Sequence, residues 1–380
     1  MTEIVYFDYN ATTPPRPEVA DAMMEVLQVA GNASAVHASG RAARARVEDA
    51  RVSIAALINA EANQIIFTGS GTESNNQALR GSGRNRILVS AIEHEAVRSA
   101  RADAEFIPVD ENGIINLQAM ENMLAASDEP AQVAVMLANN ETGVIAPVKD
   151  VVAIAHRHRA LVHCDAIQAA GKIAVDVVDL GVDMMTISAH KIGGPSGAGA
   201  LIVPGIGTMT GAEISGMQFG GGQERGYRVG TENLVGIAGL GAAAAAARAG
   251  LQDFARLADL RDAIEQGVRN IEPRATIMGE GVERLPNTTC LTMPGVDSQT
   301  QVMAFDLAGV GISAGSACSS GKTKASGVLK AMSMSDEVAG CAVRVSLGWS
   351  STADDVTTFL AAWNDLYDRQ AKHEISSPAA

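Results

Sequence analysis

Short apolar runs recur through the first two thirds of the chain, and alanine-rich segments with helical spacing separate most of them. Each run is long enough for one strand only, whereas the segments between runs are long enough for a helix. Strands that alternate with helices are typical of a mainly parallel sheet between helices, so we predict an α/β fold. The runs that we predict as strands of a seven-stranded sheet are residues 64–68, 86–90, 105–109, 132–137, 161–165, 184–188 and 200–203.

Two long segments have a helical pattern. Residues 34–57 predict one amphipathic helix, and residues 234–266 are so rich in alanine and leucine that they predict long helices. Beyond them the pattern changes, which indicates a second structural unit. Its expected elements are a strand at 288–293, a helix from Ser298, a glycine-rich loop at 311–321 and a last helix from Ala353.

This change of pattern predicts two domains. We expect a large domain over residues 15–255 and a smaller α+β domain formed by residues 1–14 and 256–380. The small domain would carry a mobile loop at about residues 312–327, where glycine and serine dominate.

Composition and charge narrow the function. The 380 residues have a net charge of −14, which would repel nucleic acid, and no run of lysine and arginine interleaves with aromatic residues. No basic leader and no long uninterrupted apolar stretch is present, so we expect a cytoplasmic protein without membrane insertion. The four cysteines lack CxxC spacing, and reduced thiols are expected.

Two charged residues follow neighbouring strands of the predicted sheet. Lys191 comes just after the run 184–188, and Asp165 ends the run 161–165. Because parallel strands bring their carboxyl ends to one crevice, these side chains could share a site. A lysine can form a Schiff base with an aldehyde cofactor, and a buried aspartate can hold a pyridine nitrogen protonated. Taken singly, an exposed lysine and a helix-capping aspartate remain alternatives.

The segment 68–76, Thr-Gly-Ser-Gly-Thr-Glu-Ser-Asn-Asn, leads from a strand into a helix. Its backbone N–H groups and the helix dipole suit one phosphate, although an ordinary turn would look the same. The third glycine of a dinucleotide fingerprint is replaced by Ser74, and no P-loop lysine follows. A nicotinamide dehydrogenase therefore stays a weaker alternative.

Histidine, cysteine and aspartate crowd together between His156 and Asp165. Strand and helix geometry would scatter these side chains, and neither HExxH nor paired CxxC spacing occurs, so we expect no metal site.

Cys318 lies among glycine, serine and alanine at 311–321, a composition that favours an exposed, movable loop. A nucleophilic thiol needs exposure, whereas structural cysteines lie among apolar side chains. Cys164, Cys290 and Cys341 have such apolar neighbours in the sequence. We therefore expect Cys318 to be the reactive cysteine.

An ordered series of motifs covers nearly the whole chain. They are FDYNATT at 7–13, GTESN at 71–75, EHE at 93–95, NNETG at 139–143, HCDAIQ at 163–168, SAHK at 188–191, RVGTEN at 228–233, SAC at 316–318 and RVSLG at 344–348. In this series the chain resembles the class V aminotransferase family of fold-type I enzymes that depend on pyridoxal phosphate (PLP). Within that family it is most similar to the cysteine desulfurases of the NifS/IscS type.

The resemblance implies how the cofactor is held. Lys191 would carry PLP as a Schiff base, Asp165 would pair with the pyridine nitrogen, Gln168 would bond the phenolic oxygen and His94 would stack on the ring. The implied phosphate contacts are Gly71, Thr72, Ser188, His190 and, from the other subunit of a homodimer, Thr231.

The resemblance also implies the reaction. Asn140 and Arg344 would hold the carboxylate of L-cysteine, and Cys318 would take its sulfur as a persulfide while alanine leaves. The Ser-Ala-Cys-Ser-Ser sequence is similar to the long-loop group of desulfurases, which implies an iron–sulfur scaffold protein as acceptor and transient contact of Cys318 with a cluster.

The sequence is also compatible with several alternative functions. Residues 322–327 replace the family's acidic and proline-containing stretch, which leaves the sulfur acceptor open: iron–sulfur assembly or another thio-cofactor. A selenocysteine lyase or another PLP β-lyase is the nearest alternative. A non-catalytic regulator with this fold, or a sulfur-relay module, is an alternative of a different class.

Overall fold

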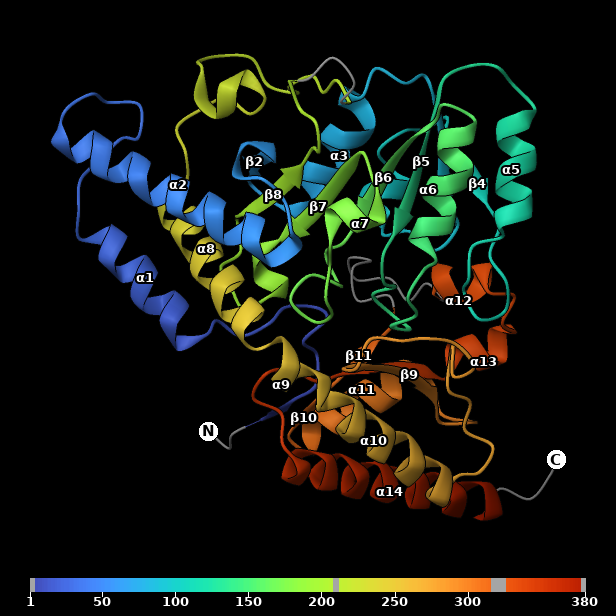
Figure 1. Cartoon of the computed structure of the whole chain (residues 1–380). Helices are drawn as coiled ribbons and strands as arrows, with labels where there is room; N and C mark the ends of the chain where they lie inside the picture. Colours follow the sequence, from blue (N-terminus) through green and yellow to red (C-terminus); the bar gives the residue numbers. More distant parts are fainter. Residues whose placement is uncertain (1–3, 208–211, 316–325, 377–380) are drawn as a thin grey trace.

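A seven-stranded sheet forms the centre of the larger part of the molecule (Figure 1). The computed structural model describes residues 4–207, 212–315 and 326–376. The strand order is β2-β8-β7-β6-β5-β3-β4, and β8 runs antiparallel to both its neighbours while the other pairs are parallel. The strands are β2 Ile65–Thr68, β3 Arg86–Ser90, β4 Glu105–Ile107, β5 Ala131–Met136, β6 Leu161–Asp165, β7 Met184–Ser188 and β8 Gly199–Ile202.

This arrangement confirms the predicted α/β fold and its mainly parallel sheet. Most of these strands are buried along their whole length, because helices cover the sheet, and continuous burial is what an unbroken apolar run provides. The helices of this part are α1 Pro17–Leu27, α2 Ala38–Ile58, α3 Gly71–Gly81, α4 Glu95–Arg98, α5 Leu117–Ala125, α6 Val148–Arg157, α7 Val177–Leu180 and α8 Leu234–Ala249.

Helices α2 and α8 lie side by side at one edge of the molecule (Figure 1). The pattern over 34–57 predicted α2 but placed its start four residues too early. The helix begins at Ala38, after the ring of His37 accepts a hydrogen bond from the Gly40 amide. A Cβ on Gly241 would lie 2.6 Å from the Cα of Ala50, so this glycine allows the two backbones to approach closely.

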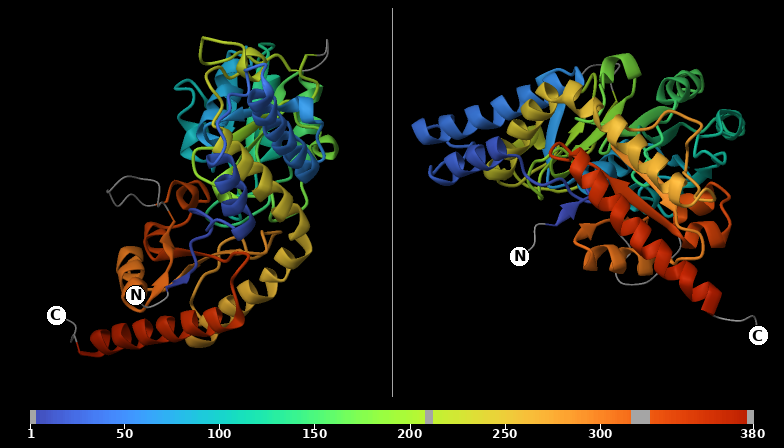
Figure 2. Two further views of the ribbon diagram at one scale, coloured as in Figure 1. Left: turned by 90° about the vertical axis from the view of Figure 1, so that its left-hand side faces the viewer. Right: turned by 90° about the horizontal axis from the view of Figure 1, so that it is seen from below.

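The segment 234–266 does not form one long helix. It breaks at Gly250 and again at Arg256, which gives α8, α9 Leu251–Ala255 and α10 Leu257–Ile271. In the figures this stretch leads from the large sheet to the smaller body of the molecule (Figures 1 and 2).

The smaller body is built on two further sheets. Strand β1 Val5–Tyr6 pairs in parallel with β10 Val310–Gly311, and β12 Ala342–Ser346 lies between β9 Thr288–Thr292 and β11 Ser313–Ala314 in an antiparallel sheet. Helices α10 and α14 pack against each other beneath them (Figure 2). The remaining helices here are α11 Ser298–Leu307, α12 Gly327–Ala331, α13 Asp336–Gly340 and α14 Ala353–Ser376.

The prediction of a continuous loop from residue 311 was wrong at its start. Residues 310–311 form β10 and residues 313–314 form β11, because β1 and β12 supply pairing partners from distant parts of the chain. A separate apolar core that includes Phe7, Phe305, Phe359 and Trp363 lies in this body. The proposed domain boundary near residue 255 stays a prediction.

In the part of the chain that the structure describes, no single helix is both long and apolar enough to cross a membrane. One pair, Leu234–Ala249 with Leu251–Ile271, meets that length and composition test only jointly, across a bend of 67°.

Candidate active site

A cavity of about 650 Å³ opens at the carboxyl ends of the parallel strands β5, β6 and β7. It brings together all of the predicted site residues except Thr231 and Cys318. Thr231 is exposed and does not line the cavity, and Cys318 lies outside the described residues. The predicted residues that line it are Gly71, Thr72, His94, Asn140, Asp165, Gln168, Ser188, His190, Lys191 and Arg344.

Lys191 lines this cavity just beyond the end of β7. It ends a short 3₁₀ turn, Ala189–Lys191, that follows β7 directly. Its Nζ donates to the backbone carbonyls of Asn10, at 2.5 Å, and Ala11, at 2.8 Å. A primary amine held in place beside a cavity suits Schiff-base formation with an aldehyde.

Asp165 is the last residue of β6 and is almost wholly buried. Its Oδ2 accepts from Asn75 Nδ2 at 2.7 Å, and its Oδ1 accepts from the Ile167 amide at 2.9 Å. Burial raises the pKa of this carboxyl, whereas the two hydrogen bonds and the nearby charges of His94 and Lys191 act against that rise. A cationic pyridine nitrogen in the cavity would give the buried carboxylate a counter-charge.

Two histidines border the cavity, and hydrogen bonds restrict both. The Nδ1 of His94 accepts from the Ala96 amide at 3.1 Å at the start of α4, so in the neutral ring the proton is on Nε2. His190 lies 3.3 Å from the Thr12 hydroxyl through its Nδ1. Burial and the Lys191 charge lower the pKa of His190 to about 4, so it is neutral at pH 7.

The start of α3 forms one end of the cavity. Ser70 caps the helix by accepting from the Glu73 amide, and Gly71 and Thr72 follow it along the cavity wall. A Cβ on Gly199 would lie 2.7 Å from the backbone carbon of Ser70, so only glycine allows β8 to support this turn. The free amides and dipole of an 11-residue helix suit one phosphate group.

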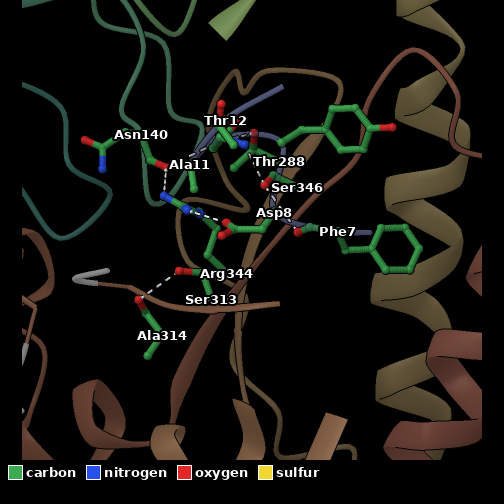
Figure 3. A network of polar contacts seen from close by, with 12 residues as sticks. Phe7, Asp8, Ala11, Thr12, Asn140, Thr288, Ser313, Ala314, Arg344 and Ser346 are labelled. Carbon is green, nitrogen blue, oxygen red and sulfur yellow. Dashed lines mark hydrogen bonds and ion pairs between the residues drawn. The ribbon is translucent and has the colours of Figure 1, made fainter. Parts of the chain in front are cut away.

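Arg344 lies at the other end, on β12, and Figure 3 shows its contacts. Its Nη2 donates to Asp8 Oδ1 at 2.6 Å and its Nη1 to the Asn140 carbonyl at 3.0 Å. Arg344 is 3% exposed, and its buried Nε has no hydrogen-bond partner among the described residues. A guanidinium fixed on two sides with a donor to spare suits a small carboxylate.

For several residues that line or border the cavity, the sequence predicted no function. Asn10 and Glu141 lie inside quoted motifs, yet the motifs do not say that both are buried at this site. Glu141 accepts a hydrogen bond from Ser326 Oγ at 2.5 Å, and burial raises its pKa to about 7. Glu93, next to His94, is fully buried, and burial raises its pKa well above the usual range. The sequence signal that could have indicated these residues is a polar side chain within a segment that is expected to be buried.

Cys164 and Cys290 have the buried settings that the sequence suggested, whereas Cys341 lies at the end of α13. Cys164 and Cys290 are wholly buried in strands, and burial raises the pKa of Cys290 to about 12 and that of Cys164 well above its usual value. Cys341 is partly buried, and none of the three lines the cavity. The residues that crowd between 156 and 165 point to separate partners: His156 to Asp183 and His163 to Thr186.

The cavity fits PLP with an amino acid. A Schiff-base amine, a buried carboxylate and a helix N-terminus match the aldehyde, the pyridine nitrogen and the phosphate of that cofactor. Arg344 lines the same cavity, and a guanidinium there suits the carboxylate of an amino acid.

Known proteins resemble this chain over almost its full length. A cysteine desulfurase of Cereibacter sphaeroides is 38% identical over 97% of this chain and 96% of its own, and the cysteine desulfurase IscS of Dictyoglomus turgidum is 37% identical over 94% and 92%. The crystal structure of a NifS-like protein from Rickettsia africae covers 96% of this chain and all of its own, with a TM-score of 0.88 and 32% identity.

The family profile described as aminotransferase class-V matches residues 5–359. Together these matches confirm the resemblance, the fold type and the PLP cofactor that the sequence predicted. The chain belongs to the class-V aminotransferase family.

Proposed function

We propose that this protein is a PLP-dependent cysteine desulfurase, which converts L-cysteine into L-alanine and leaves the sulfur on Cys318 as a persulfide. The observation that carries the proposal is the presence of Lys191, Asp165 and Arg344 around one cavity. Relatives named cysteine desulfurase support it. So does the solved structure of SspA in complex with cysteine, which is 28% identical with a TM-score of 0.76 and covers 90% of this chain.

The residues have distinct tasks in this mechanism. When bound, PLP withdraws electrons from the Cα of the amino acid. Asp165 keeps the pyridine nitrogen protonated, and Arg344 fixes the substrate carboxylate so that Cα lies near Lys191. Lys191 Nζ then accepts the Cα proton and later returns a proton to the product. His94, through Nε2, exchanges a proton with the substrate thiol.

The sulfur transfer is balanced within the active site. The Cys318 thiolate attacks the sulfur of the substrate, so an S–S bond forms while the C–S bond of cysteine breaks. The carbon that loses sulfur gains a proton, and alanine leaves. The sulfur is oxidised and the carbon is reduced, so no outside oxidant is needed.

We propose further that the enzyme is a cytoplasmic homodimer whose partner subunit contributes Thr231 to the phosphate site. The support is that Thr231 is exposed and absent from the cavity of its own chain, and that Phe219, on the same segment, is 97% exposed. The proposed acceptor is an iron–sulfur scaffold protein, with transient cluster contact through Cys318, because relatives carry the name IscS.

The deciding experiment is persulfide mapping. Purified enzyme is incubated with L-cysteine without reductant, and alanine is assayed while peptide mass spectrometry locates added sulfur. We expect one extra sulfur on Cys318 together with alanine, loss of both in Cys318→Ala, and wild-type behaviour in the matched control Cys341→Ala.

Other outcomes identify the alternatives. Alanine without an adduct would indicate a simple lyase, and faster turnover of selenocysteine by both wild type and Cys318→Ala would indicate a selenocysteine lyase. If neither alanine nor the sulfur adduct forms, the non-catalytic regulator is the alternative that remains.

A further inference from the structure

A second lysine lies buried behind the cavity. Lys172 is 4% exposed, and it is not among the residues that line the large cavity. It follows Gly171, whose φ of +74° is left-handed and whose missing Cβ would lie 2.9 Å from Ala247 and 3.0 Å from Ile192. A glycine is required there, and the resulting turn brings Lys172 back against Gln168.

The amine of Lys172 has two partners, and both are neutral. Its Nζ donates to Gln168 Oε1 and to Asn10 Oδ1, each at 2.7 Å. No ion pair of Lys172 occurs within the described residues, so an ammonium here would be buried without a counter-charge. Burial, together with the charges of Lys191 and Arg344, lowers the pKa of Lys172 well below its usual value.

A neutral amine matches this environment. It has two N–H groups, and the two oxygens account for both. It therefore acts as a donor without adding positive charge beside Lys191 and Arg344. Its function must lie in what it does to its two partners.

The contact with Gln168 removes an ambiguity. A glutamine amide can face either way, with oxygen and nitrogen exchanged. Here Lys172 engages Oε1, and Nε2 donates to the Asn10 carbonyl at 2.9 Å. With Oε1 turned to the lysine, the second N–H of Nε2 is left for a ligand in the cavity that Gln168 lines.

We propose that Lys172 is a positioning residue, which fixes the side-chain amide of Gln168 so that an Nε2 hydrogen is presented to the phenolic oxygen of bound PLP. The inference rests on the proposed function, in which Gln168 bonds that oxygen. Lys172 contacts Gln168 directly, and it also holds Asn10, whose carbonyl accepts from Lys191. Without the amine, the Gln168 amide can turn its oxygen toward the phenolic oxygen, where two acceptors repel.

The test is a double-mutant cycle with Lys172→Met, Gln168→Leu and the pair. Methionine has a similar length and no donor. Two quantities are measured: the affinity of the cofactor-free protein for PLP, and the pH at which the bound cofactor changes its absorption. Loss of a donor leaves the phenolic oxygen more basic, so we expect Lys172→Met to raise that pH and to weaken PLP binding about tenfold, or ~1.4 kcal/mol.

The double variant shows whether Lys172 acts through Gln168. If Lys172 acts through Gln168, Lys172→Met changes nothing further in the Gln168→Leu background. Equal shifts in both backgrounds, or PLP affinity within twofold of wild type for Lys172→Met, overturn the inference. Asn287→Ala is the matched control, because Asn287 Nδ2 contacts the same Asn10 oxygen at 3.3 Å without touching Gln168. It should lower thermal stability and leave the absorption change where it is.

Two further arrangements keep the result decisive. If Lys172→Met does not fold, Lys172→Gln takes its place. Glutamine keeps an N–H donor, so we expect this variant to change its absorption at the wild-type pH. A shift of that pH in Lys172→Gln would contradict the inference. A wild-type protein that binds no PLP would refute the proposed function itself. A wild type that binds PLP and releases alanine, with Lys172→Met identical to it, would refute the role of Lys172 alone.

Discussion

Glu141 should make the stability of this protein depend on pH in a way that one substitution removes. The carboxyl is buried between the cavity and Ser326, whose hydroxyl donates to it at 2.5 Å. Burial raises its pKa from 4.5 to about 7, even though Ser326, Arg344 and His94 act in the opposite direction. The substitution is Glu141→Gln, which keeps the size and an acceptor for Ser326 but cannot ionise.

The magnitude follows from the two pKa values. The folded protein holds this proton more tightly than the unfolded chain, so the stabilisation is complete below about pH 4.5 and is lost as the pH rises through about 7. A shift from 4.5 to about 7, at ~1.4 kcal/mol per unit, corresponds to about 3 kcal/mol. Glu141→Gln should therefore gain stability relative to wild type, by up to that amount, as the pH is raised.

The assay is urea unfolding of the holoenzyme at a series of pH values from about 5 to 8.5, with the same excess of PLP for each protein. Glu129→Gln, on an exposed glutamate, measures what the substitution does by itself. A difference between wild type and Glu141→Gln that stays constant across the series would refute the reasoning, because it would mean that Glu141 ionises equally easily in both states.

Three further substitutions test other contacts. Arg344→Lys keeps the charge but loses the planar fork, so KM for L-cysteine should rise about 30-fold, or ~2 kcal/mol, in steady-state kinetics, while PLP absorption is unchanged; an unaltered KM contradicts the assigned role. Arg51 donates to both oxygens of Glu224, so Glu224→Gln removes its buried counter-charge and leaves only the exposed Glu48 as an ion-pair partner; it should cost ~3 kcal/mol in urea unfolding. Glu48→Gln, at the exposed partner of the same arginine, should cost under ~1 kcal/mol, and equal losses would argue against burial as the cause. Lys191→Ala should abolish borohydride trapping of PLP on the peptide that contains residue 191, and persistent trapping there or at another lysine would contradict its role.

The strands could be predicted because burial leaves a direct mark on the sequence. Most strands of the large sheet are mainly apolar, and the predicted ranges differ from the observed ones by at most two residues at either end. The strand order could not be predicted in the same way, since an apolar run does not specify its neighbours. Nothing in the residues Gly199–Ile202 says that β8 lies antiparallel between β2 and β7. Likewise, β10 and β11 are two residues long and exist through their pairing with distant strands.

The same distinction explains which site residues the sequence could predict. Asp165 ends one parallel strand and Lys191 comes just after another, and the rule that parallel strands end at one crevice predicted that they lie together. Lys172 had no such signal, because a lysine after a glycine turn normally indicates exposure. Its burial follows from the approach of Gly171 to Ala247 and Ile192, which only the assembled fold contains.

The segment from Asp8 to Thr12 shows why a motif can be noticed without its role being understood. Asp8 holds Arg344 at the carboxylate end, the Asn10 carbonyl accepts from Lys191 in the centre, and the Thr12 hydroxyl contacts His190. The segment follows β1, which pairs with β10 in the smaller body, and its contacts with Lys191 and His190 join it to the end of β7 in the large sheet. Some of these contacts are made by backbone carbonyls, which every residue type supplies. Side-chain chemistry alone therefore could not reveal that this short segment holds both Lys191 and Arg344.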